Sequence, residues 1–282
     1  ARLPEGADVL VDETAHDALW AHARMSGWVA APNGTGHTLA MGLANSETGV
    51  ITEPPQKVEG QWPIGQARAD WLLLDVTQAI GRVAFSFAWS EADFAILSAH
   101  KLGGPKGVGA LIACEGIDIP ALTLGGGQEM SRRSGTENII GITGFGAAIE
   151  AAMADLEAGI WAKIADLRNI LEKRIAESEN ETIFVGKDAN RLPNTSCFIT
   201  PGWKGETQVM LMDLAGYAVS AGSACSSGKV KPSRVLRALG YGQAEAGAAI
   251  RVSLGPETTE QDVLGFAEAW ARENEKRRAR SR

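Results

Sequence analysis

Residues 70–76 read DWLLLDV. The apolar run 71–74 is followed by the carboxylate of Asp75 and then by Val76. Two similar runs follow, DFAILSA at 93–99 and VGALIAC at 108–114. Apolar runs of this length are typical of strands that are covered on both faces, as in a parallel sheet. The three runs therefore predict an α/β fold built on a mainly parallel sheet.

A long helical pattern occupies residues 140–176, where apolar residues recur at helical spacing. The pattern is longer than an ordinary globular helix, so we expect it to link two domains, 1–150 and 151–282. Shorter elements follow it: a strand at 197–200, a helix at 205–216, a strand at 249–254 and a last helix opened by Thr259 and Asp262 as a capping box. The second domain is therefore expected to be smaller and of the α+β class.

The composition narrows the classes of partner. The chain has 282 residues and a formal net charge of −7, which argues against nucleic acid or an anionic membrane surface as the main partner. We expect no secretory leader and no segment with the apolar length to cross a bilayer. The three cysteines, Cys114, Cys197 and Cys225, show no CxxC spacing, which indicates a reducing compartment, a cytoplasmic location and no metal site.

Two glycine-rich stretches resemble nucleotide-binding motifs and fail their spacing rules. GSACSSGK at 222–229 has five residues between its glycines where a P-loop has four, and Val230 follows the lysine where Ser or Thr is required. GGPKGVG at 103–109 lacks the GxGxxG spacing of a dinucleotide fold. Both nucleotide-binding interpretations are rejected.

Lys101 stands at the end of an apolar run, after Ser98 and His100 and before a glycine turn. A lysine in this position is suited to imine chemistry, although most lysines in turns are simply exposed. Asp75 ends another apolar run, with Gln78 three residues later. A carboxylate carried into a site by a buried strand needs a cationic partner, and a protonated pyridine nitrogen would serve.

Five motifs extend this pattern along the chain: DVTQ at 75–78, SAHK at 98–101, GGGQEMSRRSGTEN at 125–138, SAGSACSSG at 220–228 and IRVSLG at 250–255. In this order they resemble the cysteine desulfurases, class V enzymes of fold type I that depend on pyridoxal 5′-phosphate, and among them the branch that supplies sulfur for iron–sulfur clusters. The resemblance implies a large domain with a seven-stranded, mainly parallel sheet and a smaller C-terminal domain that carries Cys225. It also implies that the large domain is incomplete ahead of the histidine motif around His16.

The resemblance assigns the cofactor contacts. Lys101 would bind the cofactor covalently, Asp75 would pair with the pyridine nitrogen and Gln78 would reach the phenolic oxygen. His16 would stack on the ring and carry protons, although by itself it reads as a capping or core histidine. Asn45 would lie beside cofactor and substrate, with Ser46 where many members have Asn or His.

The resemblance also assigns the phosphate and substrate contacts. Ser98 and His100 would bind the phosphate, and Thr136 would complete that site in the neighbouring subunit, which implies a homodimer. Arg251 would hold the carboxylate of the substrate L-cysteine with its forked guanidinium, unless it is a surface arginine at a strand edge.

Cys225 would then accept the substrate sulfur as a persulfide, leaving L-alanine, and pass it to an acceptor protein such as an iron–sulfur scaffold. Its stretch of small residues suits a carrier that has to move. Cys114 and Cys197 are expected to be small buried side chains. Three alternatives stay open: a selenocysteine lyase, a class V aminotransferase, which has no use for Cys225, and a scaffold protein without cofactor.

Overall fold

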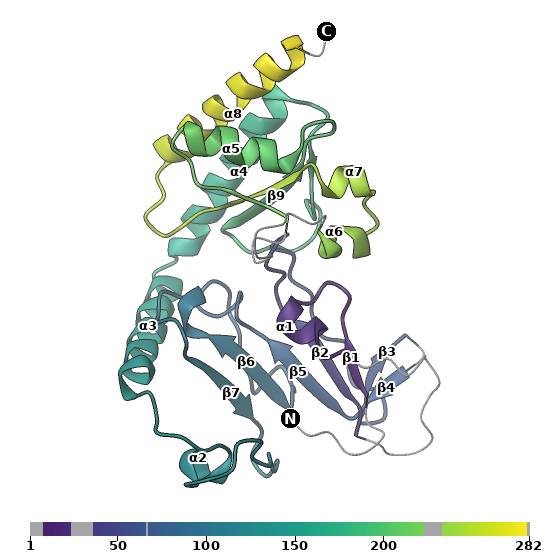
Figure 1. Cartoon of the computed structure of the whole chain (residues 1–282), viewed down its shortest axis with the longest axis vertical. Helices are drawn as coiled ribbons and strands as arrows, with labels where there is room; N and C mark the ends of the chain where they lie inside the picture. Colours follow the sequence, from purple (N-terminus) through teal and green to yellow (C-terminus); the bar gives the residue numbers. More distant parts are fainter. Residues whose placement is uncertain (1–7, 24–35, 66, 223–232, 281–282) are drawn as a thin grey trace. The chain divides into compact units, whose positions relative to one another are not determined.

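The computed structural model describes residues 8–23, 36–65, 67–222 and 233–280 (Figure 1). The chain divides into two compact units. Unit 1 comprises residues 1–44 and 52–154, and unit 2 comprises residues 45–51 and 155–282. The chain leaves unit 1 within helix α3 (Ile139–Glu157), the helix in which the expected boundary at residue 150 also falls.

Unit 1 is built on a five-stranded sheet whose strand order is β1-β2-β5-β6-β7. Its strands are β1 (Val9–Val11), β2 (Thr38–Gly42), β5 (Trp71–Asp75), β6 (Phe94–Ser98) and β7 (Gly109–Ala113). The first four strands pair in parallel, and β7 pairs antiparallel with β6. The α/β fold with a mainly parallel sheet is therefore confirmed. The expected number of seven strands is not confirmed, because the described residues form a sheet of five strands here. The number seven came from the resemblance and not from apolar runs in this sequence.

Short elements complete unit 1. They are helix α1 (Asp17–Trp20), the hairpin of β3 (Trp62–Ile64) and β4 (Ala67–Ala69), the 3₁₀ turn η1 (Ala99–Lys101) and the single turn α2 (Gln128–Ser131). Leu72 and Leu74 of β5 are fully buried, as the DWLLLDV run predicts. Strand β7 is different. Leu111 and Ile112, which point to opposite faces, are 52% and 37% exposed, so the prediction that this strand is covered on both faces is wrong within the described chain. Among the described residues β7 pairs with β6 alone, so it is an edge strand of this sheet.

The helical pattern at 140–176 forms two helices, α3 and α4 (Ile160–Ser178), because Gly159 interrupts it with a left-handed φ of 71°. Helix α3 packs closely on the turns of unit 1. A Cβ atom on Gly81 would lie 2.6 Å from Cβ of Ala152, so this approach requires glycine.

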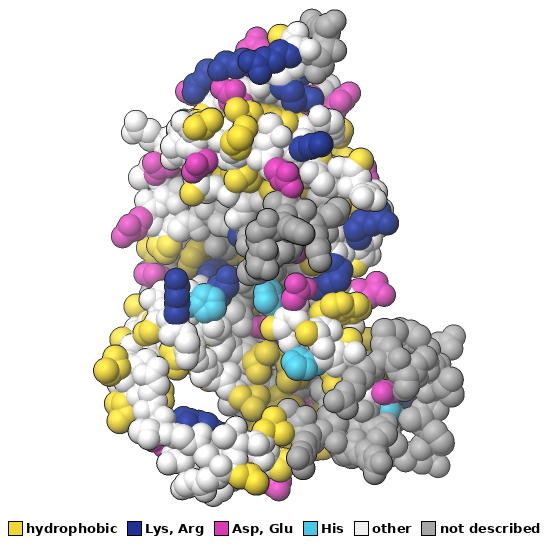
Figure 2. Space-filling model, in the orientation of Figure 1, with side chains coloured by type: hydrophobic (Ala, Val, Ile, Leu, Met, Phe, Trp, Pro, Cys, Tyr) yellow, Lys and Arg dark blue, Asp and Glu magenta, His cyan; other side chains and the backbone are white. Residues whose placement is uncertain are grey.

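Helix α3 also carries exposed apolar side chains: Ile139 is 70% exposed, Ile140 87% and Ile142 45%. Figure 2 shows hydrophobic side chains, in yellow, on the surface at its lower left. By length and composition alone this helix is apolar enough to cross a membrane. The expectation that no segment reaches that apolar length is therefore wrong for α3. The sequence analysis missed the apolar length of this helix, because much of it is glycine and alanine and not large apolar residues.

Unit 2 contains a four-stranded antiparallel sheet of order β10-β11-β9-β8. Its elements are β8 (Ile183–Phe184), β9 (Thr195–Ile199), α5 (Gly205–Leu214), β10 (Ser220–Ala221), α6 (Arg234–Ala238), α7 (Gln243–Ala246), β11 (Ala249–Ser253) and α8 (Glu260–Arg280). The capping box at Thr259 and Asp262 is formed, with Thr259 N–H donating to Asp262 over 2.9 Å and Asp262 N–H donating to Thr259 over 3.2 Å. The α+β prediction for this half of the chain is confirmed.

Two hydrophobic clusters cover the two faces of this sheet. On one face, residues of α4, α5 and α8 surround Phe198 and Trp270, whose rings meet edge to face at 5.8 Å. On the other face, Leu236 of α6 and Ala246 of α7 pack on Cys197 and Ile199. A sheet covered on both faces gives unit 2 its own core.

The segment 45–51 is fastened to unit 2 by backbone hydrogen bonds. Leu192 N–H donates to Gly49 O over 2.7 Å, and Ile51 N–H donates to Asn190 O over 2.8 Å. Close by, the buried Arg191 side chain forms a two-pronged ion pair with Glu172, at 2.8 and 3.0 Å. These contacts explain why residues near the N-terminus belong to the C-terminal unit.

Candidate functional site

Three of the predicted cofactor residues lie at one edge of the sheet of unit 1. Asp75 is the last residue of β5 and pairs in register with Ile96 of the adjacent parallel strand β6. Ser98 ends β6, and Lys101 follows in the turn η1. Since the carboxyl ends of adjacent parallel strands meet at one edge, the carboxylate, the hydroxyl and the amine are brought together there.

Asp75 is half-buried, and its Oδ1 accepts a hydrogen bond of 2.9 Å from the N–H of Thr77. This bond holds the carboxylate in a turn beyond the strand. Lys101 is also half-buried, so it is not the freely exposed turn lysine of the alternative interpretation. Ser98 and His100 were predicted as a pair, and Oγ of Ser98 lies 2.8 Å from Nδ1 of His100.

Arg82 is a site residue that the sequence analysis missed. Its Nη1 donates to the carbonyl oxygen of Gln78 over 2.8 Å, and its Nη2 donates to the carbonyl oxygen of Lys101. Burial lowers the pKa of this guanidinium from its ordinary value. One forked side chain therefore joins the segment after β5 to the segment after β6. No sequence signal marks it, because it binds backbone carbonyl oxygens, which every residue carries.

His16 follows β1 and caps the short helix α1: its Nδ1 accepts a hydrogen bond of 3.1 Å from the N–H of Ala18. The capping role considered for this histidine is therefore present. Because Nδ1 is the acceptor, the neutral ring carries its proton on Nε2. The ring is exposed, and its predicted role against the cofactor stays a prediction.

The two predicted substrate residues both belong to unit 2. Asn45 Oδ1 accepts the N–H groups of Glu47 and Thr48, each at 2.9 Å. Arg251 of β11 donates from Nη1 to the carbonyl oxygen of Ser46 over 2.7 Å. Arg251 is half-buried, and its Nε finds no acceptor among the described residues, so it is not a surface arginine.

Thr136 and Cys225 are the remaining predicted residues. Thr136 is exposed on the segment between α2 and α3. Cys225 lies outside the described residues, between Gly222 and Ser233. Both assignments stay predictions.

The other two cysteines differ from each other. Cys197 is buried in β9, as predicted, and burial raises the pKa of its thiol to about 12. Cys114 is exposed, so the prediction that it is buried is wrong. It stands just beyond the open edge strand β7, with its Sγ donating to the carbonyl oxygen of Ala92 over 3.3 Å.

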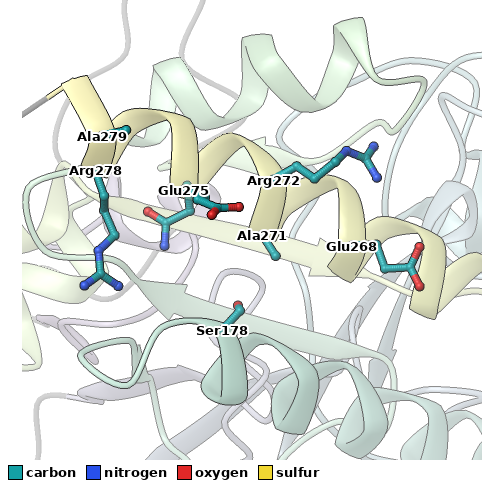
Figure 3. Close-up of a pocket in the computed structure, with 8 residues that line it drawn as sticks. Ser178, Glu268, Ala271, Arg272, Glu275, Arg278 and Ala279 are labelled. Carbon is teal, nitrogen blue, oxygen red and sulfur yellow. The ribbon is translucent and has the colours of Figure 1, made fainter.

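Two surface grooves lie in unit 2. One, of about 680 Å³, is lined by Ser178 of α4 and residues of α8 such as Glu268 and Arg278 (Figure 3). The other, of about 710 Å³, is lined by Trp203, by residues of α7 and by Ala221 and Gly222. Neither contains a residue that the sequence predicts to bind cofactor or substrate.

The groups at the edge of unit 1 fit pyridoxal phosphate by their chemistry. An amine can bind an aldehyde carbon, a half-buried carboxylate can pair with a protonated pyridine nitrogen, and a hydroxyl next to an imidazole can donate to a phosphate. Lys101, Asp75 and the pair Ser98 and His100 supply these groups.

Curated proteins that resemble this chain are named cysteine desulfurases. The one from Cereibacter sphaeroides is 40% identical over 220 residues, which cover 78% of this chain and 55% of the relative. Cysteine desulfurase IscS of Dictyoglomus turgidum is 37% identical over 220 residues, with the same shares of both chains. The chain therefore spans about 55% of the length of the relatives it matches.

Among solved structures, the NifS-like protein from Rickettsia africae ESF-5 superposes with a TM-score of 0.79 at 28% identity, covering 94% of this chain and 75% of the other. The apo structure of cysteine desulfurase from Thermococcus onnurineus NA1 has a TM-score of 0.68 at 21% identity, over 83% of this chain and 59% of the other, and supports the fold alone. The family model described as aminotransferase class-V matches residues 33–266, which is most of the sequence. The chain belongs to the aminotransferase class-V family.

Proposed function

We propose that this chain carries the catalytic parts of a cysteine desulfurase that uses pyridoxal phosphate, takes L-cysteine as substrate and passes sulfur to an acceptor protein. The observation that carries the proposal is the group of Asp75, Ser98, His100 and Lys101 at one sheet edge. The family depends on pyridoxal phosphate in general, and the relatives named above support the desulfurase activity over the other activities considered.

The residues at the carboxyl ends of β5 and β6 have separate roles in this proposal. The Lys101 amine holds the cofactor and, once free, accepts the proton from Cα of the substrate. Asp75 keeps a proton on the pyridine nitrogen, and Ser98 with His100 binds the phosphate. When bound, pyridoxal phosphate supplies an electron sink for the electron pair left at Cα. Arg251 binds the substrate carboxylate, a role supported by its half-buried guanidinium, whose Nε has no acceptor among the described residues.

Cys225 is the proposed sulfur acceptor within the chain. Its thiolate attacks the substrate sulfur, so that an S–S bond forms and the Cβ–S bond of the substrate breaks. The electron pair of the broken bond stays with the carbon fragment, which takes up one proton at Cβ, regains the Cα proton from Lys101 and leaves as L-alanine. A thiol of an acceptor protein then takes the outer sulfur of the persulfide, or added thiol releases it as sulfide and is oxidised to a disulfide.

We also propose that two copies of the chain associate through unit 1. Exposed apolar side chains gather on the segment that leads into α3, where Leu124 is 84% exposed and Met130 88%, and they continue onto α3. Patches of this kind mark interfaces in proteins. Thr136 lies within this segment, which suits its predicted contribution to the site of a second copy.

The test is incubation of the purified chain and pyridoxal phosphate with L-cysteine and a reducing thiol. We expect alanine and sulfide in equal amounts, a yellow protein and a dimeric mass in solution. Transfer of the amino group to a keto acid without sulfide would identify an aminotransferase instead. A colourless protein that binds no pyridoxal phosphate would contradict the proposal and favour the scaffold alternative.

A further inference from the structure

Both terminal nitrogens of the Arg251 guanidinium are bound within unit 2. Nη1 donates to the backbone carbonyl oxygen of Ser46 over 2.7 Å, and Nη2 donates to Oγ of Ser220 over 3.3 Å. A guanidinium is planar and rigid, so two bonded nitrogens fix both its position and the tilt of its plane. It carries five N–H groups, and binding these two acceptors therefore does not exhaust its capacity to bind a carboxylate.

The strand that carries Arg251 is itself fixed in the sheet of unit 2. Strand β11 lies between β10 and β9, and Arg251 pairs with Ser220 on one side and with Cys197 on the other. Its chain neighbours Ile250 and Val252 are buried. Residues directly opposite each other on adjacent antiparallel strands present their side chains on the same face of the sheet. The register of β10 and β11 therefore places the Ser220 hydroxyl beside the guanidinium.

The Ser46 carbonyl oxygen is held by the turn in which it lies. Asn45 Oδ1 accepts the N–H groups of Glu47 and Thr48, each at 2.9 Å, just after Ser46. Oγ of Ser233, a fully buried residue, donates to the carboxylate of Glu47. The acceptor of Nη1 is therefore a backbone atom in a turn that is fixed by its neighbours.

We propose that Ser220 is a positioning residue for substrate binding: with the Ser46 carbonyl oxygen, its hydroxyl sets the plane in which Arg251 receives the carboxylate of L-cysteine. A carboxylate accepts two parallel N–H groups from a guanidinium when the two planes match, so the tilt of the fork affects the affinity. Of the two acceptors, the Ser220 hydroxyl is the one that a side-chain substitution removes. The substrate part of this inference rests on the proposed function, because it assumes that Arg251 binds the carboxylate.

The first test is the turnover of L-cysteine by Ser220→Ala and Ser220→Thr, both loaded with pyridoxal phosphate. Ser220→Ala should raise KM about fivefold and change kcat by less than about twofold, because the lost hydrogen bond frees the guanidinium without touching the reacting atoms. Ser220→Thr keeps a hydroxyl and should restore most of the affinity. The matched control is Ser253→Ala, at an exposed serine of β11, which should have the KM of the wild type.

The second test does not require turnover. Phenylglyoxal modifies arginine side chains, and peptide mass spectrometry gives its rate at Arg251 relative to Arg272, an exposed arginine of α8. Ser220→Ala should be modified about threefold faster at Arg251, because fewer of the guanidinium N–H groups are bound. Ser220→Thr and Ser253→Ala should match the wild type.

An unchanged KM in active Ser220→Ala, or an unchanged rate of modification at Arg251, overturns the inference. A KM that rises equally in Ser220→Ala and Ser253→Ala does the same. If the wild type makes no alanine from L-cysteine, the proposed function fails by itself. The modification rates then decide alone whether Ser220 holds Arg251.

Discussion

Ser98 Oγ and His100 Nδ1 lie 2.8 Å apart at the end of β6, where one residue separates them in the sequence. The hydrogen bond fixes the imidazole beside the hydroxyl before any ligand arrives. Lys101 is the next residue, so the phosphate donors and the amine are placed by one turn of backbone. A ligand that carries both a phosphate and an aldehyde therefore meets groups whose order is already set.

Lys101→Ala should abolish covalent binding of pyridoxal phosphate, because no other amine occupies this turn at the carboxyl end of β6. The measurement is mass spectrometry after borohydride reduction, which adds one cofactor mass to the wild type at Lys101. The matched control is Lys106→Ala, an exposed lysine of the following turn. Stoichiometric label on the Lys101→Ala protein would contradict the assignment.

Arg82→Met should weaken binding of pyridoxal phosphate by tenfold or more and lower the melting temperature. The guanidinium fork joins the carbonyl oxygens of Gln78 and Lys101, and charged hydrogen bonds of this kind contribute about 1.5–3 kcal/mol each. Absorbance titration gives the affinity. Arg68→Met, which removes only an exposed ion pair with Glu59, should leave the affinity unchanged. Equal affinities in both variants would mean that the fork does not position Lys101.

The Cys197 thiol should make stability depend on pH above pH 9. Burial raises its pKa in the folded protein from 9.0 to about 12, so the unfolded chain loses this proton first as pH rises. The contribution of the protonated Cys197 thiol to the free energy of unfolding is fully present below pH 9. Between pH 9 and 12 the free energy of unfolding falls by up to about 1.4 kcal/mol per pH unit. Urea unfolding of wild type and Cys197→Ala at pH 8 and pH 10.5 tests this. Cys197→Ala should show the smaller decrease, and parallel decreases would contradict the prediction.

Glu172→Gln should destabilise unit 2 by about 3–5 kcal/mol, because it leaves the buried Arg191 guanidinium without its charge partner. Ser196, which donates to the same carboxylate over 2.8 Å, loses its charged acceptor as well. Chemical denaturation measures the loss. Arg174→Met removes an exposed pair with Glu177 on the same helix and should cost less than about 1 kcal/mol. If the two variants lose the same stability, the buried pair does not hold unit 2 together.

The sequence predicts the strands of unit 1 wherever burial is strong. Leu72 and Leu74 alternate with less buried residues, yet their run was apolar enough to identify β5. The run at 108–114 looked the same and forms an exposed edge strand, because composition reports β-propensity and not what covers the strand. The prediction that Cys114 is buried rested on the same apolar run and was wrong for the same reason.

Contacts between distant segments were beyond the reach of the sequence. Lys101, Asp75 and Ser98 were predictable because each ends or follows an apolar run, and parallel strands bring such ends together. Arg82 and Glu47 have no such signal: one binds backbone carbonyl oxygens, and the other binds a serine far along the chain. Every residue has a backbone carbonyl acceptor, so the sequence does not show which of them a given side chain binds, and the contact appears only in the folded structure.

The placement of residues 45–51 in unit 2 means that the chain passes between its two units at three points, 44/45, 51/52 and 154/155. Neither unit is a continuous stretch of the sequence. A single recombination at residue 155 would deliver a C-terminal unit without Ser46 and Glu47, so that Arg251 and Ser233 would lose acceptors that they bind here. Halves exchanged between diverged relatives would therefore combine Ser46 and Glu47 from one parent with Arg251 and Ser233 from the other, which favours inheritance of the two units together.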